Sequence, residues 1–261
     1  MVFLLLPCLL VAQEMFPVND ISDKRPESFA FTHAVIHLDY QSTLNASTLL
    51  ISKGKVVAAG NNVHIPPDAV VIDVRGAHIY PSFIDLFSDY GIQAPSMPAR
   101  EERWSKARFE SSRKGAYGWN EAIHPETRAD ELWRTDEKTA ADYRKQGFGA
   151  VLTHLHDGIA RGSGVLVTLG NRRENEEIVK GIASAHYAFD KGSSLQDYPT
   201  SLMGAIALLR QSYLDAQWYA ASRGAVPYNI SLDAWNRIQS VPQIFEVDDV
   251  LSFTKSRQNR Q

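Results

Sequence analysis

Two histidines separated by one residue, with an aspartate directly after them, form the most chemically suggestive segment of the chain, residues 153–158. The apolar run before them predicts a strand. Because side chains alternate across a strand, His154 and His156 would share one face, and two imidazoles on one face can bind zinc. Asp157 opens the following loop, where its carboxylate could bind the metal, orient a ring nitrogen or transfer a proton. We therefore predict His154 and His156 as metal ligands and Asp157 as a catalytic residue.

A structural role for this pair stays open. One histidine can hydrogen-bond a turn expected at Arg161–Gly164 while the other packs in an interface. That turn could also hold an anion through its backbone amides, but it lacks the spacing and the lysine of a nucleotide-binding loop. The other histidines are scattered and are interpreted as surface or satisfied core residues: His33, His37, His64, His78, His124 and His186.

Carboxylates follow a second predicted strand near the end of the chain. The run 242–247 is apolar enough for a buried strand, and Glu246 stands at its end. A carboxylate there could act as a metal ligand or general base, so we predict Glu246 as a catalytic residue. Asp248 and Asp249 are better explained as caps of the helix expected at 248–255.

The elements that would position these residues fall into two blocks. Residues 28–85 carry short β-branched runs with Gly, Asn and Pro between them, including a tight hairpin at Lys53-Gly54. After a long loop predicted at 91–125, strand and helix signals alternate. Helices are expected at 130–146, 201–223 and 233–239, with strands at 150–156 and 165–169. Such alternation is typical of a parallel sheet or barrel.

Composition narrows the functional classes. The 261 residues are 44% hydrophobic with a formal net charge of -3, which indicates a globular chain and argues against nucleic acid as a partner. The single cysteine, Cys8, lies in an apolar leader, so a disulfide framework and cysteine-ligated zinc are excluded for the rest. The leader, residues 1–13, predicts a signal peptide and an exported protein without a membrane span in its mature form, although a buried first strand is an alternative.

The order of motifs in the first block resembles the amino-terminal part of the amidohydrolase superfamily. A glycine hairpin is followed by Val71-Ile72-Asp73-Val74-Arg75-Gly76 and then by Ile79-Tyr80-Pro81-Ser82-Phe83-Ile84-Asp85. Residues 130–170 and 242–255 resemble stretches of its imidazolonepropionase-like branch. The resemblance implies an α/β fold with a small β-sandwich-like composite domain at 28–85 and an incomplete TIM-type (β/α) barrel at 86–261.

The resemblance also implies a divalent metal, with zinc the first choice, and departs from its pattern at the first metal motif. The family's histidine pair on the first barrel strand is replaced by Phe87 and Asp89, of which only Asp89 can offer oxygen to a metal. A barrel needs about 250 residues, so we interpret the chain as a fragment of a longer protein, or one whose barrel is completed by a partner chain or a second copy. The implied lysine or glutamate, two histidines and an aspartate would lie downstream.

Two functions follow from these observations. The first is a metal-dependent hydrolase acting on carbon-nitrogen bonds of a small cyclic amide, where a bound metal would activate water. The second is a catalytically degenerate protein that keeps the fold for binding or assembly, because Phe87 cannot ligate a metal. An unrelated exported β-rich binding module is a third reading, which predicts an independent core for residues 28–90.

Overall fold

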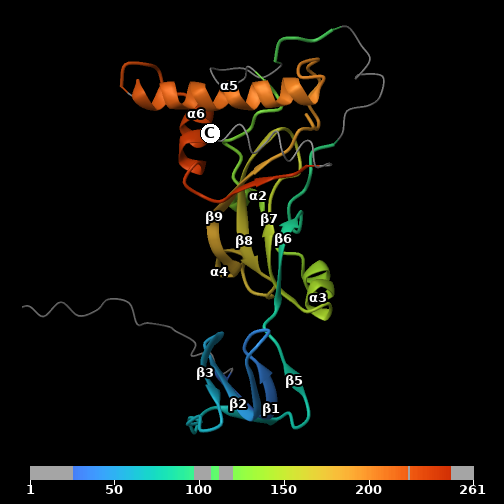
Figure 1. Cartoon of the computed structure of the whole chain (residues 1–261), viewed down its shortest axis with the longest axis vertical. Coiled ribbons are helices and arrows are strands. Elements are labelled where there is room, and N and C mark those ends of the chain that lie inside the picture. The colour runs from blue at the N-terminus through green and yellow to red at the C-terminus, as the bar shows by residue number, and fades with distance from the viewer. Residues whose placement is uncertain (1–25, 97–106, 112–119, 223, 248–261) are drawn as a thin grey trace, which may run out of the picture. The chain divides into compact units, whose positions relative to one another are not determined.

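The computed structural model describes residues 26–96, 107–111, 120–222 and 224–247 (Figure 1). Its contacts divide the chain into two units, residues 1–81 and 82–261, whereas the sequence motifs put the division after residue 85. Each unit contains one five-stranded sheet, so the fold is mixed α/β. The predicted leader at 1–13 and the predicted helix at 248–255 lie outside the described residues.

The first unit is a single sheet with the order β3-β2-β1-β4, in which β5 also pairs with β1. Its strands are β1 (Ser28–His37), β2 (Thr43–Ser52), β3 (Lys55–Gly60), β4 (Val70–Asp73) and β5 (His78–Ile79). The predicted hairpin is confirmed, because β2 and β3 are antiparallel and Lys53 and Gly54 both have positive φ between them. Alternate residues of β1, among them Ala34 and Ile36, form the core. The described strands of this unit therefore belong to a single sheet.

The second unit contains a sheet with the order β10-β9-β8-β7-β6. Its strands are β6 (Phe83–Ser88), β7 (Phe148–Thr153), β8 (Ala160–Thr168), β9 (Ile178–Tyr187) and β10 (Gln243–Phe245). β6 is parallel to β7 and β9 is parallel to β10, but β8 is antiparallel to both of its neighbours. The described strands therefore form an open sheet with a reversed middle strand, and a closed TIM barrel is not seen.

The turn predicted at residues 161–164 is wrong, because these residues lie inside β8. The glycines there serve close packing instead of a turn. A Cβ atom on Gly164 would lie 2.6 Å from His186 Nε2 and from Ser184 Oγ on the neighbouring strand β9. Gly162 and Gly164, which predicted a turn, thus belong to a strand. Glycine is needed at 164 because the strand passes close to large side chains.

Five helices are described in the second unit: α2 (Ala129–Leu132), α3 (Glu137–Lys145), α4 (Glu174–Glu177), α5 (Leu202–Ala221) and α6 (Ile230–Ile238). The single helix predicted at 130–146 is two helices, since Asp136 caps α3 by accepting hydrogen bonds from Lys138 N and Thr139 N. The long helix predicted at 201–223 is confirmed as α5, with Ser201 as its N-cap. Among the described residues, no helix combines the length and apolar character needed to cross a bilayer.

Two apolar cores support the sheet of the second unit. One gathers Ile159, Tyr187, Leu208 and Trp235 beneath α5 and α6. The other gathers Tyr90, Trp133, Val151 and Leu169 around α2 and β7. Each large side chain buried in this way contributes about 1.5–3 kcal/mol. The first core contains Tyr187 at the end of β9 and the second contains Val151 on β7, so together they hold in place the segments where the predicted site residues lie.

Candidate functional site at the carboxyl edge of the second sheet

Four strands of the second sheet run in the same direction, because β8 reverses between β7 and β9. Their carboxyl ends therefore meet at one edge of the sheet. Asp89 follows β6, His154 follows β7 and Glu246 follows β10. Three predicted site residues from distant parts of the sequence are thus carried to the same edge by strand direction.

Three histidines and one phenylalanine pack ring against ring at this edge, and we call Phe87, His154, His156 and His186 the histidine stack. The rings of His154 and His186 are stacked, with centroids 3.6 Å apart and planes inclined by 13°. The His156 ring lies 4.1 Å from that of His154. Phe87 lies 5.2 Å from His154 and 4.6 Å from His156. His186, interpreted from sequence as a surface or core residue, is therefore a member of the stack.

The three histidines differ in their hydrogen bonds. His186 Nε2 lies 2.7 Å from Ser184 Oγ, two residues earlier on β9. His156 Nε2 lies 3.2 Å from the Ser88 carbonyl oxygen, which can only accept, so this nitrogen carries the proton. Neither ring nitrogen of His154, a residue only 1% exposed, has a hydrogen-bond partner among the described atoms. His154 is consequently the one histidine of the stack that has no hydrogen bond to its ring among the described atoms.

Burial keeps these imidazoles neutral. It lowers the pKa of His186 to about 3, with His156 and Arg161 acting in the same direction. Burial likewise lowers the pKa of His154 and of His156. For His156, the positive charge of Arg161 adds to this effect, whereas the carboxylates of Asp89 and Glu246 oppose it. Both carboxylates therefore lie close enough to His156 to interact with it electrostatically.

Glu246 forms an ion pair with a buried arginine. Arg161 Nη1 donates to Glu246 Oε2 at 2.5 Å, and Arg161 Nε donates to the Gly158 carbonyl at 3.1 Å. The Arg161 side chain is 8% exposed, whereas that of Glu246 is 40% exposed. Sequence reasoning missed Arg161 because it placed this residue in a turn. The signal that could have found it is a charged residue inside the apolar stretch that follows Asp157-Gly158.

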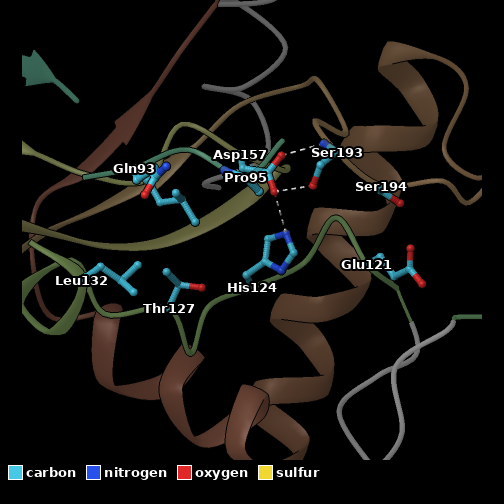
Figure 2. Close-up of a pocket in the computed structure, with 10 residues that line it drawn as sticks. Gln93, Pro95, Glu121, His124, Thr127, Leu132, Asp157, Ser193 and Ser194 are labelled. Atoms are coloured by element: carbon cyan, nitrogen blue, oxygen red, sulfur yellow. Dashed lines mark hydrogen bonds and ion pairs between the residues drawn. The ribbon is translucent and has the colours of Figure 1, made fainter. Parts of the chain in front are cut away.

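Asp157 does not join the histidine stack. His154 and His156 belong to the stack, whereas Leu155 and Asp157 line a cavity of about 470 Å³. Figure 2 shows Asp157 beside Ser193 and His124 in this cavity. In this cavity, Asp157 Oδ1 accepts from Ser193 N at 2.6 Å and Oδ2 accepts from Ser193 Oγ at 2.7 Å. His124 Nε2 lies 3.9 Å from Oδ2. The predicted catalytic residues Asp157 and Glu246 thus belong to different surroundings.

The described residues do not assemble the metal site that the resemblance implies. Among residues 26–96, 107–111, 120–222 and 224–247, no three His, Cys, Asp or Glu side chains are arranged to hold one ion. Stacked rings direct their nitrogen lone pairs along nearly parallel planes, whereas zinc needs donors that converge at about 2 Å. Phe87 fills with hydrocarbon the position where the family pattern has an imidazole. The arrangement offers neutral bases, one guanidinium and two carboxylates.

Comparison with known proteins finds solved structures with a similar fold, but no match to a protein family or to a curated protein. No protein-family model and no curated protein matches the chain. Among solved structures, an amidohydrolase from Thermotoga maritima is similar over 88% of this chain, with a TM-score of 0.67 and 19% identity. A second amidohydrolase shares 28% identity over 25% of this chain and 16% of its own, with a TM-score of 0.23. A prolidase complexed with N-methylphosphonate-L-proline shares 16% identity over 48% of this chain and 25% of its own, with a TM-score of 0.25.

The comparison with the Thermotoga structure therefore shows the fold: this chain has a fold that an amidohydrolase also adopts. The likeness covers 61% of the Thermotoga chain, so this chain spans about three fifths of that protein's length. The other two likenesses are too low in TM-score to add to this conclusion.

Proposed function

We propose that this chain is the amino-terminal part of a hydrolase of the amidohydrolase type, related to the imidazolonepropionase-like branch, which cleaves a carbon-nitrogen bond in a small cyclic amide. The observation that carries the proposal is the gathering of Asp89, His154 and Glu246 at the carboxyl edge of a sheet whose fold an amidohydrolase shares. Enzymes built on parallel strands keep their reactive groups at this edge.

The side chains at this edge are suited to moving a proton and binding negative charge. His156 donates its Nε2 proton to the Ser88 carbonyl, which leaves Nδ1 as the basic nitrogen of a neutral imidazole. We assign it the role of general base toward water. Arg161, held by Glu246, would stabilise the oxyanion that forms when water attacks an amide carbonyl. No step is assigned to a metal, because the described residues do not hold one.

The test is turnover of cyclic amides by the full-length protein. A panel of lactams, cyclic ureas and imidazolones is incubated with the protein, with and without added zinc, and ring opening is followed by mass spectrometry. We expect His156→Ala to lower kcat/KM by about 100-fold or more, the usual loss on removing a general base. His37→Ala, on a strand of the first unit, is the matched control and should leave kcat/KM unchanged. Absence of ring opening in every condition would refute the proposal.

A catalytically degenerate binding protein is the second candidate, and one observation favours it. Phe87 packs against both His154 and His156 at the position of the expected imidazole. Comparing binding with turnover in the purified full-length protein separates the two candidates. Ring opening that is lost on His156→Ala supports the hydrolase, whereas a protein that binds a cyclic amide without opening it supports the second candidate.

Export forms part of the proposal. The apolar leader ends at Ala12, and the polar pair Gln13-Glu14 follows it, so cleavage is expected near residues 12–13. Mass spectrometry of the secreted protein tests this expectation. Recovery of an intracellular chain that keeps Met1 would contradict it.

A further inference from the structure

We infer that the cavity beside Asp157 is a binding site for a small organic cation, an ammonium or guanidinium group that carries a short apolar chain. This inference is independent of the proposed hydrolase, because a protein without catalytic activity can have the same site. The cavity and the histidine stack use different side chains of one segment, since Leu155 and Asp157 line the cavity whereas His154 and His156 belong to the stack. Its volume of about 470 Å³ lies within the range of small-molecule sites.

The Asp157 carboxylate is rigidly held and retains acceptor capacity. Ser193 supplies one hydrogen bond to each of its oxygens, from the backbone N–H and from the hydroxyl group. A carboxylate oxygen can accept a second bond, so each oxygen can still receive a ligand N–H. The residue is 5% exposed, and His124 Nε2 lies 3.9 Å from Oδ2, within ion-pair distance if the imidazole is protonated.

The backbone around the carboxylate is packed so closely that it admits glycine alone. Gly192 precedes Ser193 and has φ of 60°, in the left-handed region. A Cβ atom added to Gly192 would overlap Asp157 Oδ1 and would lie 2.5 Å from Gly158 N. The loop before α5 is therefore wrapped against Asp157, which orients its carboxylate before a ligand arrives. Pre-organisation of this kind lowers the entropic cost of binding.

The lining of the cavity selects the sign of the ligand's charge. Of the ten residues that line it, none is Lys or Arg, whereas two, Asp157 and Glu121, carry carboxylates. An anionic ligand would meet repulsion from these two carboxylates, and no Lys or Arg among the described lining residues would offset it. A cation would form charge-assisted hydrogen bonds with Asp157, which are stronger than bonds between neutral groups. Pro95, Leu132 and Leu155 offer apolar surface to the remainder of the ligand.

The inference is tested with three probes of equal chain length: n-butylammonium, 1-butanol and butyrate. Each is titrated into the full-length protein at constant ionic strength, and binding is measured by calorimetry and by saturation-transfer NMR. We expect n-butylammonium to bind with a dissociation constant in the millimolar range, the affinity expected of a fragment of about five heavy atoms. 1-Butanol should bind about tenfold more weakly, because it lacks the charge-assisted bond, and butyrate should not bind.

Two variants locate the site. Asp157→Asn preserves shape and an oxygen acceptor for Ser193 N, and it should weaken n-butylammonium binding by about tenfold or more while leaving 1-butanol unchanged. Asp142→Asn, an exposed carboxylate paired with Lys145 on α3, is the matched control and should leave all three probes unchanged. Leu132→Trp, at a lining residue that is 44% exposed, should narrow the cavity and weaken both binding probes.

Several results would overturn the inference. One is butyrate binding as tightly as n-butylammonium to the unmodified protein. Another is unchanged n-butylammonium affinity in a folded Asp157→Asn variant, with folding checked by its thermal unfolding midpoint. If Asp157→Asn does not fold, two other measurements decide whether the site exists. Equal binding of the three probes to the unmodified protein would reject it. Unchanged n-butylammonium binding in Leu132→Trp would also reject it.

Discussion

His154 combines nearly complete burial with two ring nitrogens that have no hydrogen-bond partner among the described atoms. Burial lowers its pKa, so the ring is neutral and carries one donor and one acceptor, both unmet. A buried polar atom without a partner costs about 1–3 kcal/mol. The ring contacts of the histidine stack must offset this cost, because His154 touches both His156 and His186.

Replacing His154 by phenylalanine should therefore leave stability unchanged or raise it. His154→Phe keeps a ring in the stack and removes both unpartnered nitrogens, so we expect a change between zero and about +1 kcal/mol in the free energy of unfolding. His186→Phe, the matched comparison, loses the bond to Ser184 and should lower this free energy by about 1–3 kcal/mol. Urea unfolding measures both. A large loss in His154→Phe would mean that its nitrogens have partners in the protein.

Acid should destabilise the second unit well above the range where carboxylates titrate. The pKa of His186 falls from 6.5 to about 3 on folding. Between these pH values, the imidazole of His186 is protonated in the unfolded chain and neutral in the folded chain. The contribution of this shift to the free energy of unfolding is fully present above pH 6.5. It declines as pH falls toward 3, by about 1.4 kcal/mol per pH unit for each such histidine. Urea unfolding at pH 7.5, 6.0 and 5.0 tests this expectation. His186→Phe should show a shallower decline, and an equal decline would exclude this histidine as the cause.

The pattern of strands in the sequence was enough to find the site residues that lie at the ends of parallel strands. It was not enough to find the site residues that are brought together by side-chain packing. Asp89, His154 and Glu246 each lie in or near the end of a predicted strand, so strand direction alone brings them to one edge. His186 lies near the end of β9, a strand for which no expectation was formed, and its ring partner is 32 residues away in sequence, at His154. Such a contact depends on the reversed strand β8, which no local pattern signals.

At the scale of elements, β8 decides how the site is built. Its reversal places its first residues, with Arg161 among them, at the same edge as the last residues of β7 and β9. Gly164 lets β8 pass close to Ser184 and His186. The same glycines caused the wrong prediction of a turn. The Lys53-Gly54 hairpin was predicted correctly because there both residues have positive φ, the conformation that such a pair signals in a two-residue turn.

Gly164→Ala should test the close approach of β8 and β9. The added methyl group would lie 2.6 Å from both Ser184 Oγ and His186 Nε2, so it must separate the strands or break this hydrogen bond. We expect a loss of about 1–3 kcal/mol in the free energy of unfolding, as for other overpacked cores. Ser163→Ala, the adjacent residue with one long bond to Thr127, is the control and should cost less. Equal thermal stability of Gly164→Ala and the unmodified chain would show that the sheet can yield there.

At the scale of the molecule, the second sheet ends in an edge strand with exposed apolar side chains. β6 is the terminal strand of the sheet among the described strands. Ile84 and Leu86 on β6 are 55% and 61% exposed. A long exposed apolar edge strand is a template for pairing with other strands. This edge gives the expectation of a fragment or of a partner chain a surface on which it can be tested.

The 261-residue chain produced alone should show little or no hydrolase activity and should self-associate. Activity should be low because the downstream ligands and aspartate implied by the resemblance are expected outside the chain. Association should follow from the β6 edge, and Leu86→Lys should reduce it, because an edge lysine opposes strand pairing. Light scattering and the cyclic-amide assay measure the two effects. Strong turnover by the monodisperse chain would contradict both expectations.

The reversal of β8 has a consequence for the order of folding. Strands β7, β8 and β9 follow one another in the chain and pair in that order, so they form an up-and-down meander between residues 148 and 187. Pairings between consecutive strands close short loops and are reached early, whereas the contact between β6 and β7 must first close a loop of about sixty residues. His154, His156 and His186 all lie within or beside the meander. The histidine stack can therefore be largely complete in an early folding species, before the strand that supplies Phe87 docks against it.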